Sequence, residues 1–364
     1  MTRIYLIRHA EAEGNIYRRA HGQYDGWIIG RGYVQIEHLK ARFINEKIDA
    51  VYASDLTRAS VTASAIYEPH GLVLNKTDQL REVKLGEWED MAWGDIEYYY
   101  PEMNRYFSID PEKWHIEGNE DFHHVQKRMT GCIQEIAEQH DGETVAAFSH
   151  GLAIRMFISA ISGVPSNEIK KVPYFDNTAV TLLQYDNGEF TIKFQGDNSH
   201  LSKEYSTFAN QSWWRSEKLW VYENLRFMTF NKERDSAIWE LYRNESSRES
   251  CADVEYTAFI GQEAVAIVGL DTMRGTRKEG NGESGYTYGW IDYIFVKPEF
   301  RLHNFGIQLV GQAVSHYRRL KRDKLRIKVP LNSTSLDFFR KFEFKKTAET
   351  DAFCILEKNI RNWG

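Results

Sequence analysis

Short apolar strands that alternate with amphipathic helices run through the first two hundred residues, and this alternation restricts the chain to few folds. The expected strands and helices lie, in chain order, at 3–7, 33–45, 49–54, 57–67, 120–140, 144–148 and 152–162. Strands that alternate with helices form a parallel or mostly parallel sheet, with helices on both faces. The sequence therefore predicts a three-layer α/β/α domain. Two further strands flank the hairpin signal Asp186–Glu189 and complete this domain, which is predicted to span residues 1–201.

A second α/β pattern follows. Residues 224–364 are predicted to form a domain of their own, with mixed strands and helices at 235–248, 255–260, 264–271, 290–296, 305–321, 325–329 and 333–341. Residues 202–223 lack periodicity but carry three tryptophans, which predicts a packed connector rather than a flexible linker. The glycine-rich stretch 274–285 carries little that can pack, and we expect it to be mobile.

Composition excludes several classes of protein. The chain has 364 residues, of which 42% are hydrophobic and 27% charged, as in ordinary globular proteins with about two domains. No run approaches the roughly 20 apolar residues of a membrane span, and charge comes too early at the start for a signal peptide. Three widely separated cysteines predict no disulfide framework, so we expect a cytoplasmic protein. The net charge of −6 gives no reason to expect nucleic acid as a partner.

Basic residues follow three of the predicted strands. Arg8 and His9 end the first strand, Arg58 follows the second, and His150 follows the third in Ser149-His150-Gly151. In open α/β sheets, ligands bind outside the carboxyl ends of the strands. Two guanidiniums in one crevice indicate a phosphate dianion, and a histidine between them is a candidate nucleophile or base. A lone strand-end histidine is more often structural, but packing alone does not explain all three ends.

These motifs resemble the histidine phosphatase superfamily, which has the phosphoglycerate-mutase-like fold. The similarity is carried in order by Arg8-His9-Ala10-Glu11, Ser54-Asp55-Leu56-Thr57-Arg58, Leu80-Arg81-Glu82 with Gly86-Glu87-Trp88-Glu89, and Phe148-Ser149-His150-Gly151. The resemblance implies a phosphohistidine at His9, a phosphoryl group bound by Arg8, Asn15, Arg58 and His150, and Glu82 as the proton donor. It implies a metal-independent phosphomonoesterase that acts on a small phosphorylated metabolite.

Some alternatives stay open for this domain. A metal site at His9, His21 and His150 is a rival interpretation, although the spacings typical of metal ligands are missing. Glu87 and Glu89 compete with Glu82 for the role of the acid. A mutase that moves a phosphoryl group between carbons is the alternative function.

The sequence departs from the family pattern at Ala10, at Ile28-Ile29 and at Asp90, where the family has Gly, Leu-Thr and Gly. These departures bear on substrate preference rather than on the chemistry. The aromatic residues between Trp88 and Trp114 are either a helical core face or a lid over the phosphate pocket.

The second domain carries a turn between a strand and a helix at Val296–Gly306. Backbone amides at a helix N-terminus bind pyrophosphate. This segment resembles the coenzyme-A loop of GNAT-type N-acetyltransferases, and Phe338–Phe344 resembles a later segment of that family. The resemblance implies a GNAT-like mixed α/β domain that binds acetyl-CoA through Val296, Arg301, Asn304, Gly306 and Asn332 and transfers an acetyl group to an amine acceptor.

Two departures weaken the case for catalysis in this domain. Asn304 replaces the first glycine of the loop; asparagine tolerates left-handed backbone but adds bulk. Phe339 stands where the family often has a tyrosine that protonates the thiolate. The alternative is therefore a non-catalytic module that binds acyl-CoA or a protein.

Overall fold

The computed structural model of the chain describes residues 1–211, 224–246, 249–274 and 287–361. It contains two compact units. The first comprises Met1–Ala12, Ala20–Met91 and Tyr99–Glu217, and the second comprises Glu13–Arg19, Ala92–Tyr98 and Lys218–Gly364. Residues 212–223 of the predicted connector lie outside the described residues. So does the loop that we expect to be mobile, apart from its first residue, Arg274.

The first unit is built on a six-stranded mixed sheet with the order β3-β2-β4-β1-β5-β6. Its strands are β1 (Thr2–Arg8), β2 (Ala50–Ser54), β3 (Leu74–Thr77), β4 (Thr144–Ser149), β5 (Val180–Asp186) and β6 (Glu189–Asp197). Strands β3, β2, β4 and β1 are parallel, whereas β5 and β6 are antiparallel to their neighbours. The sequence analysis did not predict β3. Its burial pattern is half-exposed and it is only four residues long, so it lacks an apolar run.

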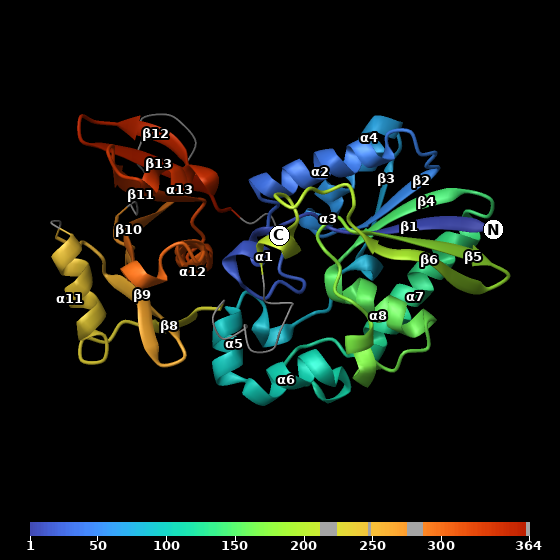
Figure 1. The fold of residues 1–364 in the computed structure, drawn as a ribbon, viewed down its shortest axis with the longest axis horizontal. Coiled ribbons are helices and arrows are strands. Elements are labelled where there is room, and N and C mark those ends of the chain that lie inside the picture. Colours follow the sequence, from blue (N-terminus) through green and yellow to red (C-terminus); the bar gives the residue numbers. More distant parts are fainter. Residues whose placement is uncertain (212–223, 247–248, 275–286, 362–364) are drawn as a thin grey trace. The chain divides into compact units, whose positions relative to one another are not determined.

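Helices cover both faces of this sheet, so the predicted three-layer α/β/α fold is confirmed (Figure 1). The helices of this unit are α2 (Gly30–Phe43), α3 (Thr57–Thr62), α4 (Ser64–His70), α6 (Pro101–Ile109), α7 (Phe122–Gln139), α8 (Gly151–Ile161) and α9 (Thr207–Asn210). Leu39 and Phe43 of α2 pack with Ile66 of α4 against one face of the sheet. On the other face, Ile136 of α7 packs against Val145 of β4, because successive side chains of a strand point to opposite faces.

Short 3₁₀ turns connect these elements at Asp78–Leu80, Gly86–Trp88, Pro111–Lys113 and Ser166–Lys171. The predicted hairpin forms as expected, with Asp186 opposite Glu189. Its two central residues, Asn187 and Gly188, both have positive φ angles, 50° and 86°, as a type I′ turn requires.

The aromatic segment that follows Trp88 forms a core cluster in the first unit. Trp88 is fully buried, and its ring lies 5.6 Å from that of Trp114 and 5.8 Å from that of Phe107. Phe122, at the start of α7, packs edge-on against Trp114. Of the two interpretations of this segment, these contacts favour the core face.

The second unit has a seven-stranded sheet with the order β12-β13-β11-β10-β9-β8-β7. Its strands are β7 (Arg226–Thr229), β8 (Val254–Ile260), β9 (Glu263–Asp271), β10 (Tyr288–Val296), β11 (Lys324–Pro330), β12 (Lys345–Glu349) and β13 (Phe353–Asn359). Among the described strands of this sheet, only β10 and β11 pair in parallel; the other neighbours are antiparallel. The helices are α11 (Ser236–Glu245), α12 (Phe305–Arg319) and α13 (Ser335–Lys341), with a 3₁₀ turn at Pro298–Phe300.

Two segments from early in the sequence belong to this second unit: α1 (Glu13–Tyr17) and most of α5 (Trp93–Tyr99). Tyr17 is buried against α12, where a Cβ atom added to Gly311 would lie only 2.5 Å from the Cβ of Tyr17. Arg318 of α12 forms a buried ion pair with Glu13, with 2.9 Å between nitrogen and oxygen. The helix α12 therefore packs closely on a segment that directly follows the first histidine motif.

No helix in the described part of the chain is both long enough and apolar enough to cross a membrane.

Candidate active site

Three adjacent parallel strands of the first unit, β2, β4 and β1, end at the same edge of the sheet. Arg8 of β1 is paired with Ser149 of β4, and the amide of His9 donates a hydrogen bond of 3.0 Å to the carbonyl of Ser149. His9 and His150 each follow this pair by one residue. Their ring centroids lie 5.2 Å apart, and both side chains are buried. The register of the sheet thus brings the two predicted histidines together.

The environment of His9 fixes its tautomer and its charge. Its Nδ1 lies 2.7 Å from the carbonyl oxygen of Ala10, which can only accept, so Nδ1 carries the proton and Nε2 keeps a lone pair in the neutral ring. Burial, followed by the charges of Arg58 and Arg8, lowers the pKa of His9 well below its usual value of 6.5. The result is a neutral imidazole with a free lone pair, as a nucleophile requires.

The two predicted arginines are buried beside these histidines. Arg58 donates hydrogen bonds of 2.6 Å to the carbonyl of Gly22 and 2.9 Å to that of Tyr24, and Arg8 donates to the carbonyl of Phe175. Burial lowers the pKa of both guanidiniums. These hydrogen bonds of both arginines go to backbone carbonyls, which carry no formal charge, so positive charge is concentrated at the strand ends.

Several buried nitrogens at this edge have no hydrogen-bond partner among the described residues: Nε of Arg8 and both ring nitrogens of His150. A buried polar atom without a partner costs about 1–3 kcal/mol, so such atoms are rare unless a ligand satisfies them. Burial is also the main reason that the pKa of His150 is lowered well below 6.5, followed by the charge of Arg58. The arrangement suits a tetrahedral anion with several acceptor oxygens.

Glu82 contacts the first turn of α8, the helix that begins directly after His150. Its carboxylate accepts hydrogen bonds from the amides of Leu152 at 3.0 Å and Ala153 at 2.8 Å. Burial lowers the pKa of Arg8 and Arg58, and the negative charge of Glu82 partly opposes that lowering. The carboxyl group therefore lies at the same strand ends as the four basic residues.

The rival carboxylate Glu89 has a different task. It accepts hydrogen bonds from the amides of Gly22, Gln23 and Tyr24 at 2.8–3.1 Å and from the amide of Leu85 at 2.9 Å. Glu89 thus organises the loop whose carbonyls Arg58 contacts.

Asn15, the remaining residue predicted to bind phosphate, lies in α1 of the second unit. Its role stays a prediction.

The metal interpretation receives no support from the described residues, because they contain no group of three or more His, Cys, Asp or Glu side chains able to hold an ion.

Asn177 is a residue that the sequence analysis missed. It is fully buried, and its side-chain amide donates a 2.9 Å hydrogen bond to the carbonyl of His9. Thr178, at φ 58°, follows it in a strained turn. The sequence around Asn177 has no periodicity, and only the fold brings it to His9.

The loop predicted to bind coenzyme A connects β10 to α12 in the second unit. Asn304 has left-handed backbone, with φ 61°, at the N-terminus of α12, so it keeps the conformation that a glycine would supply. Arg301 donates to the carbonyl of Val296 at 3.0 Å and to Glu245 at 2.6 Å. Gly306 lies against α13, since a Cβ atom there would be 3.0 Å from Cζ of Phe338.

The strands beside this loop separate. β10 and β11 pair from Tyr288–Lys324 to Ile291–Ile327 and, in the described chain, no further, although they continue to Val296 and Pro330. β10 also has an irregular register with β9 between Ile291 and Tyr293. Among the described residues, the parallel pairing of β10 with β11 thus ends at Ile291.

Asn332 and Phe339 complete the predicted set in this unit. Asn332 is exposed just after β11, whereas the loop follows β10, so both lie at the carboxyl ends of neighbouring parallel strands. Phe339 is buried in the core with Phe344, 5.2 Å between ring centroids. Position 339 therefore offers no proton donor.

Comparisons with known proteins agree with both sets of motifs. The histidine phosphatase superfamily (branch 1) matches residues 4–198, and the acetyltransferase (GNAT) family matches residues 211–344. Phosphoserine phosphatase 1 of Hydrogenobacter thermophilus is 30% identical over 207 residues, which cover 56% of this chain and 97% of that protein. Phosphoglycerate mutase-like protein 4 of Arabidopsis thaliana is 32% identical over 204 residues, which cover 55% of this chain and 87% of that protein. The solved structure of YhfR from Bacillus stearothermophilus has 30% identity and a TM-score of 0.54, covering 56% of this chain and all of that one.

Proposed function

This chain belongs to the histidine phosphatase superfamily, and from that membership we propose that its first unit is a metal-independent phosphomonoesterase with a phosphohistidine intermediate at His9. The observation that carries the proposal is the meeting of two neutral, buried imidazoles and two buried guanidiniums at one edge of the sheet. The same edge holds buried nitrogens that lack partners among the described residues.

In the first step, the lone pair on Nε2 of His9 attacks phosphorus and the bond from phosphorus to the ester oxygen breaks. Arg8, Arg58 and His150 stabilise the charge on the three other phosphoryl oxygens, with Asn15 as a further donor. Glu82 gives its proton to the departing alkoxide, which leaves as an alcohol.

In the second step, the Glu82 carboxylate takes a proton from water while the water oxygen attacks phosphorus. The phosphorus–nitrogen bond breaks, and its electron pair returns to Nε2 of His9. The products are inorganic phosphate, a neutral imidazole and a protonated Glu82, so the site is restored.

The substrate we propose is a small phosphorylated metabolite, with phosphoserine the first to test because one relative is named a phosphoserine phosphatase. The experiment is a panel of phosphomonoesters assayed with and without chelator. We expect release of phosphate to be unaffected by the chelator. Loss of activity on chelation would refute the metal-independent mechanism.

The alternative is a mutase, which is suggested by the relative named phosphoglycerate mutase-like. The two functions differ in the fate of the phosphohistidine. Enzyme labelled with radioactive phosphate should release inorganic phosphate without any acceptor if it is a phosphatase. A label that stays on the protein until a hydroxy acid is added would instead support the mutase.

For the second unit, we propose that the β10–α12 loop and the separated ends of β10 and β11 bind acyl-CoA. We further propose that the unit transfers the acetyl group of acetyl-CoA to an amine. Val296, Arg301, Asn304, Gly306 and Asn332 would hold the ligand, and acetyl-CoA would supply the acetyl thioester. Phe339 favours the alternative, a module that binds acyl-CoA or a protein without catalysis. Calorimetry on the whole chain tests binding; failure at millimolar acetyl-CoA would refute it.

A further inference from the structure

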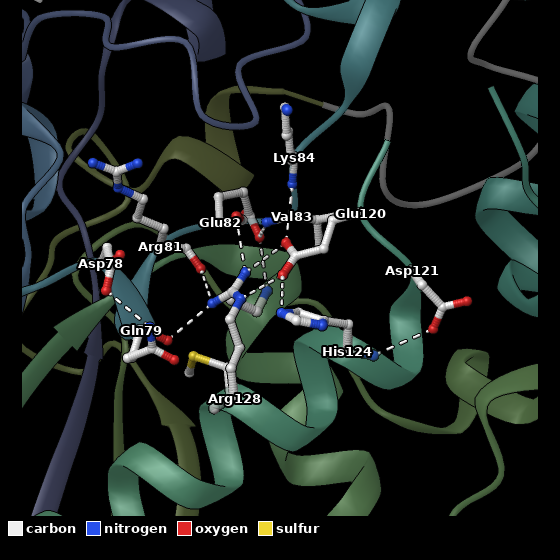
Figure 2. Close-up of polar contacts among 12 residues, drawn as sticks. Asp78, Gln79, Arg81, Glu82, Val83, Lys84, Glu120, Asp121, His124 and Arg128 are labelled. Carbon is white, nitrogen blue, oxygen red and sulfur yellow. Dashed lines mark hydrogen bonds and ion pairs between the residues drawn. The ribbon is translucent and has the colours of Figure 1, made fainter. Parts of the chain in front are cut away.

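A buried arginine that the sequence analysis did not single out, Arg128 of α7, contacts the loop that presents Glu82 (Figure 2). Only 7% of its side chain is exposed. Its Nε donates a 2.6 Å hydrogen bond to one oxygen of Glu120, and its Nη2 donates a 2.9 Å bond to the other. This bidentate pair fixes the plane of the guanidinium.

The remaining donors of Arg128 point at the backbone of the acid loop. Nη1 donates to the carbonyls of Gln79 at 2.9 Å and Arg81 at 2.7 Å, and Nη2 donates to the carbonyl of Glu82 at 3.0 Å. A guanidinium has five N–H donors, and here five bonds engage it. One side chain therefore holds three carbonyls within four consecutive residues.

Glu120 makes further contacts with the backbone of the same loop. The amide of Lys84 donates to the carboxylate of Glu120 at 3.3 Å, and the amide of Glu120 donates to the carbonyl of Lys84 at 2.9 Å. The loop is thus fixed on both sides of Glu82 by the pair Arg128–Glu120. We call this pair the loop clamp. It comprises the two bonds of Arg128 to the Glu120 carboxylate and its three bonds to backbone carbonyls of the loop.

On its other side, Glu82 is held by the first turn of α8, through the amides of Leu152 and Ala153. The helix α8 begins directly after His150. The charge of Arg128 is also one of the causes that lower the pKa of His150. The loop clamp therefore connects α7 to the carboxyl group and the second histidine of the candidate site.

We propose that Arg128 is a positioning residue for proton transfer: it holds the backbone of residues 79–82 so that the carboxyl group of Glu82 reaches the leaving oxygen. The proposal rests on the proposed function of Glu82 as the acid. A shift of about 1 Å in a catalytic group can slow a reaction by up to a hundredfold. Lysine keeps the charge but has a single nitrogen, so it cannot replace the planar fork.

The test compares two esters with the full chain. Phosphoserine has an alkoxide leaving group that needs a proton, whereas p-nitrophenyl phosphate has one that barely does. We expect Arg128→Lys to lower kcat for phosphoserine about tenfold more than for p-nitrophenyl phosphate. We expect Glu82→Gln to have the same selective effect to a larger extent. In the Glu82→Gln background, Arg128→Lys should add little to the loss on phosphoserine, because both changes act through the same carboxyl group.

Arg42→Lys is the matched control. Arg42 of α2 also bonds a carboxylate and a backbone carbonyl, both of Asp197, but Asp197 ends the edge strand β6 and not the acid loop. Its substitution should lower Tm and should change the rates on the two esters equally. If Arg128→Lys does not fold, Glu120→Gln is the milder variant, since it keeps one acceptor for Arg128 and should show the same selective loss.

Two results separate failure of this proposal from failure of the proposed function. Equal losses on both esters for Arg128→Lys, beside a selective loss for Glu82→Gln, would overturn the positioning role alone. Equal losses for Glu82→Gln itself would refute the acid assignment and the positioning role together.

Discussion

The candidate sites of the two units hold their functional groups in opposite ways. At the strand ends of the first unit, Arg8, His9, Arg58 and His150 are each at most 9% exposed. In the loop of the second unit, 46% of the Arg301 side chain is exposed, and Leu302 is fully exposed. Buried basic groups are costly unless an anion satisfies them, so the first site depends on side-chain chemistry. The second depends on backbone conformation, at Asn304 and along the separated ends of β10 and β11.

This difference explains why the motifs of the two units are unequally informative. A side-chain site needs particular residue types at particular strand ends, so its sequence signature is dense. A backbone site needs only a permitted φ and room for the ligand, so Asn304 can replace glycine without loss of the turn. Substitutions should therefore have large effects in the first unit and small ones in the second.

The largest effect is expected at the nucleophile. His9→Ala should lower phosphatase turnover by roughly a thousandfold or more, as removal of a nucleophile does in other enzymes. Steady-state rates and labelling with radioactive phosphate check this, and the label should be absent from the variant. His123→Ala, at an exposed histidine on α7, is the control and should keep full activity. If His9→Ala kept a tenth of the turnover, the phosphohistidine would be excluded.

A smaller but still large effect is expected for Arg58→Lys. Lysine keeps the positive charge, but it cannot bond both Gly22 and Tyr24 and still present a planar fork to the phosphoryl group. We expect kcat/KM to fall about a hundredfold, which corresponds to roughly 2.7 kcal/mol. Arg105→Lys, on the exposed face of α6, is the matched control. A loss for Arg58→Lys no larger than that for Arg105→Lys would argue against a phosphate contact.

The pH dependence tests whether the histidines are neutral. Because burial and the arginines lower the pKa of His9 and His150, kcat/KM corrected for substrate ionisation should show no acid limb at pH 6.5. The unfolded chain binds protons at these histidines below pH 6.5, whereas the folded chain does not. Their contribution to stability is therefore complete above pH 6.5 and falls as the pH drops below it.

Rate profiles and thermal unfolding from pH 8 to pH 5 measure both quantities. Between pH 8 and pH 5, the Tm of the double variant His9→Gln, His150→Gln should fall less than the Tm of the natural chain. An acid limb centred near pH 6.5 would show that one of the imidazoles is not shielded as the structure indicates.

The smallest effects are expected in the second unit. Asn304→Gly should tighten acetyl-CoA binding by a few-fold, because glycine adopts φ 61° at no steric cost and removes side-chain bulk, a gain of at most about 1 kcal/mol. Gly306→Ala should weaken binding, because its Cβ atom would lie 3.0 Å from Cζ of Phe338 and push the turn. Calorimetry on the whole chain measures both. Equal affinities in the two variants would show that the ligand does not use this turn.

The sequence by itself determined the elements and the residue types of the phosphate site. Helical and strand periodicity arise from local side-chain spacing, so the core strands and the long helices α2, α7, α8 and α12 were predicted to within a few residues. The motifs at Arg8-His9, Arg58 and His150 are local as well. Their convergence followed from a general property of parallel sheets, since the carboxyl ends of neighbouring strands share one edge.

The tertiary structure alone decided how these groups are held. Asn177 lies 168 positions from His9, and Arg128 lies 46 positions from Glu82, so no local pattern connects either pair. Burial of the two histidines, and with it the direction of their pKa, is a property of the packed core. The same holds for α1, which follows the first histidine motif in sequence yet packs on α12 because Gly311 leaves room for Tyr17. Close packing depends on atoms that the fold brings together from distant positions, and a linear pattern does not contain that information.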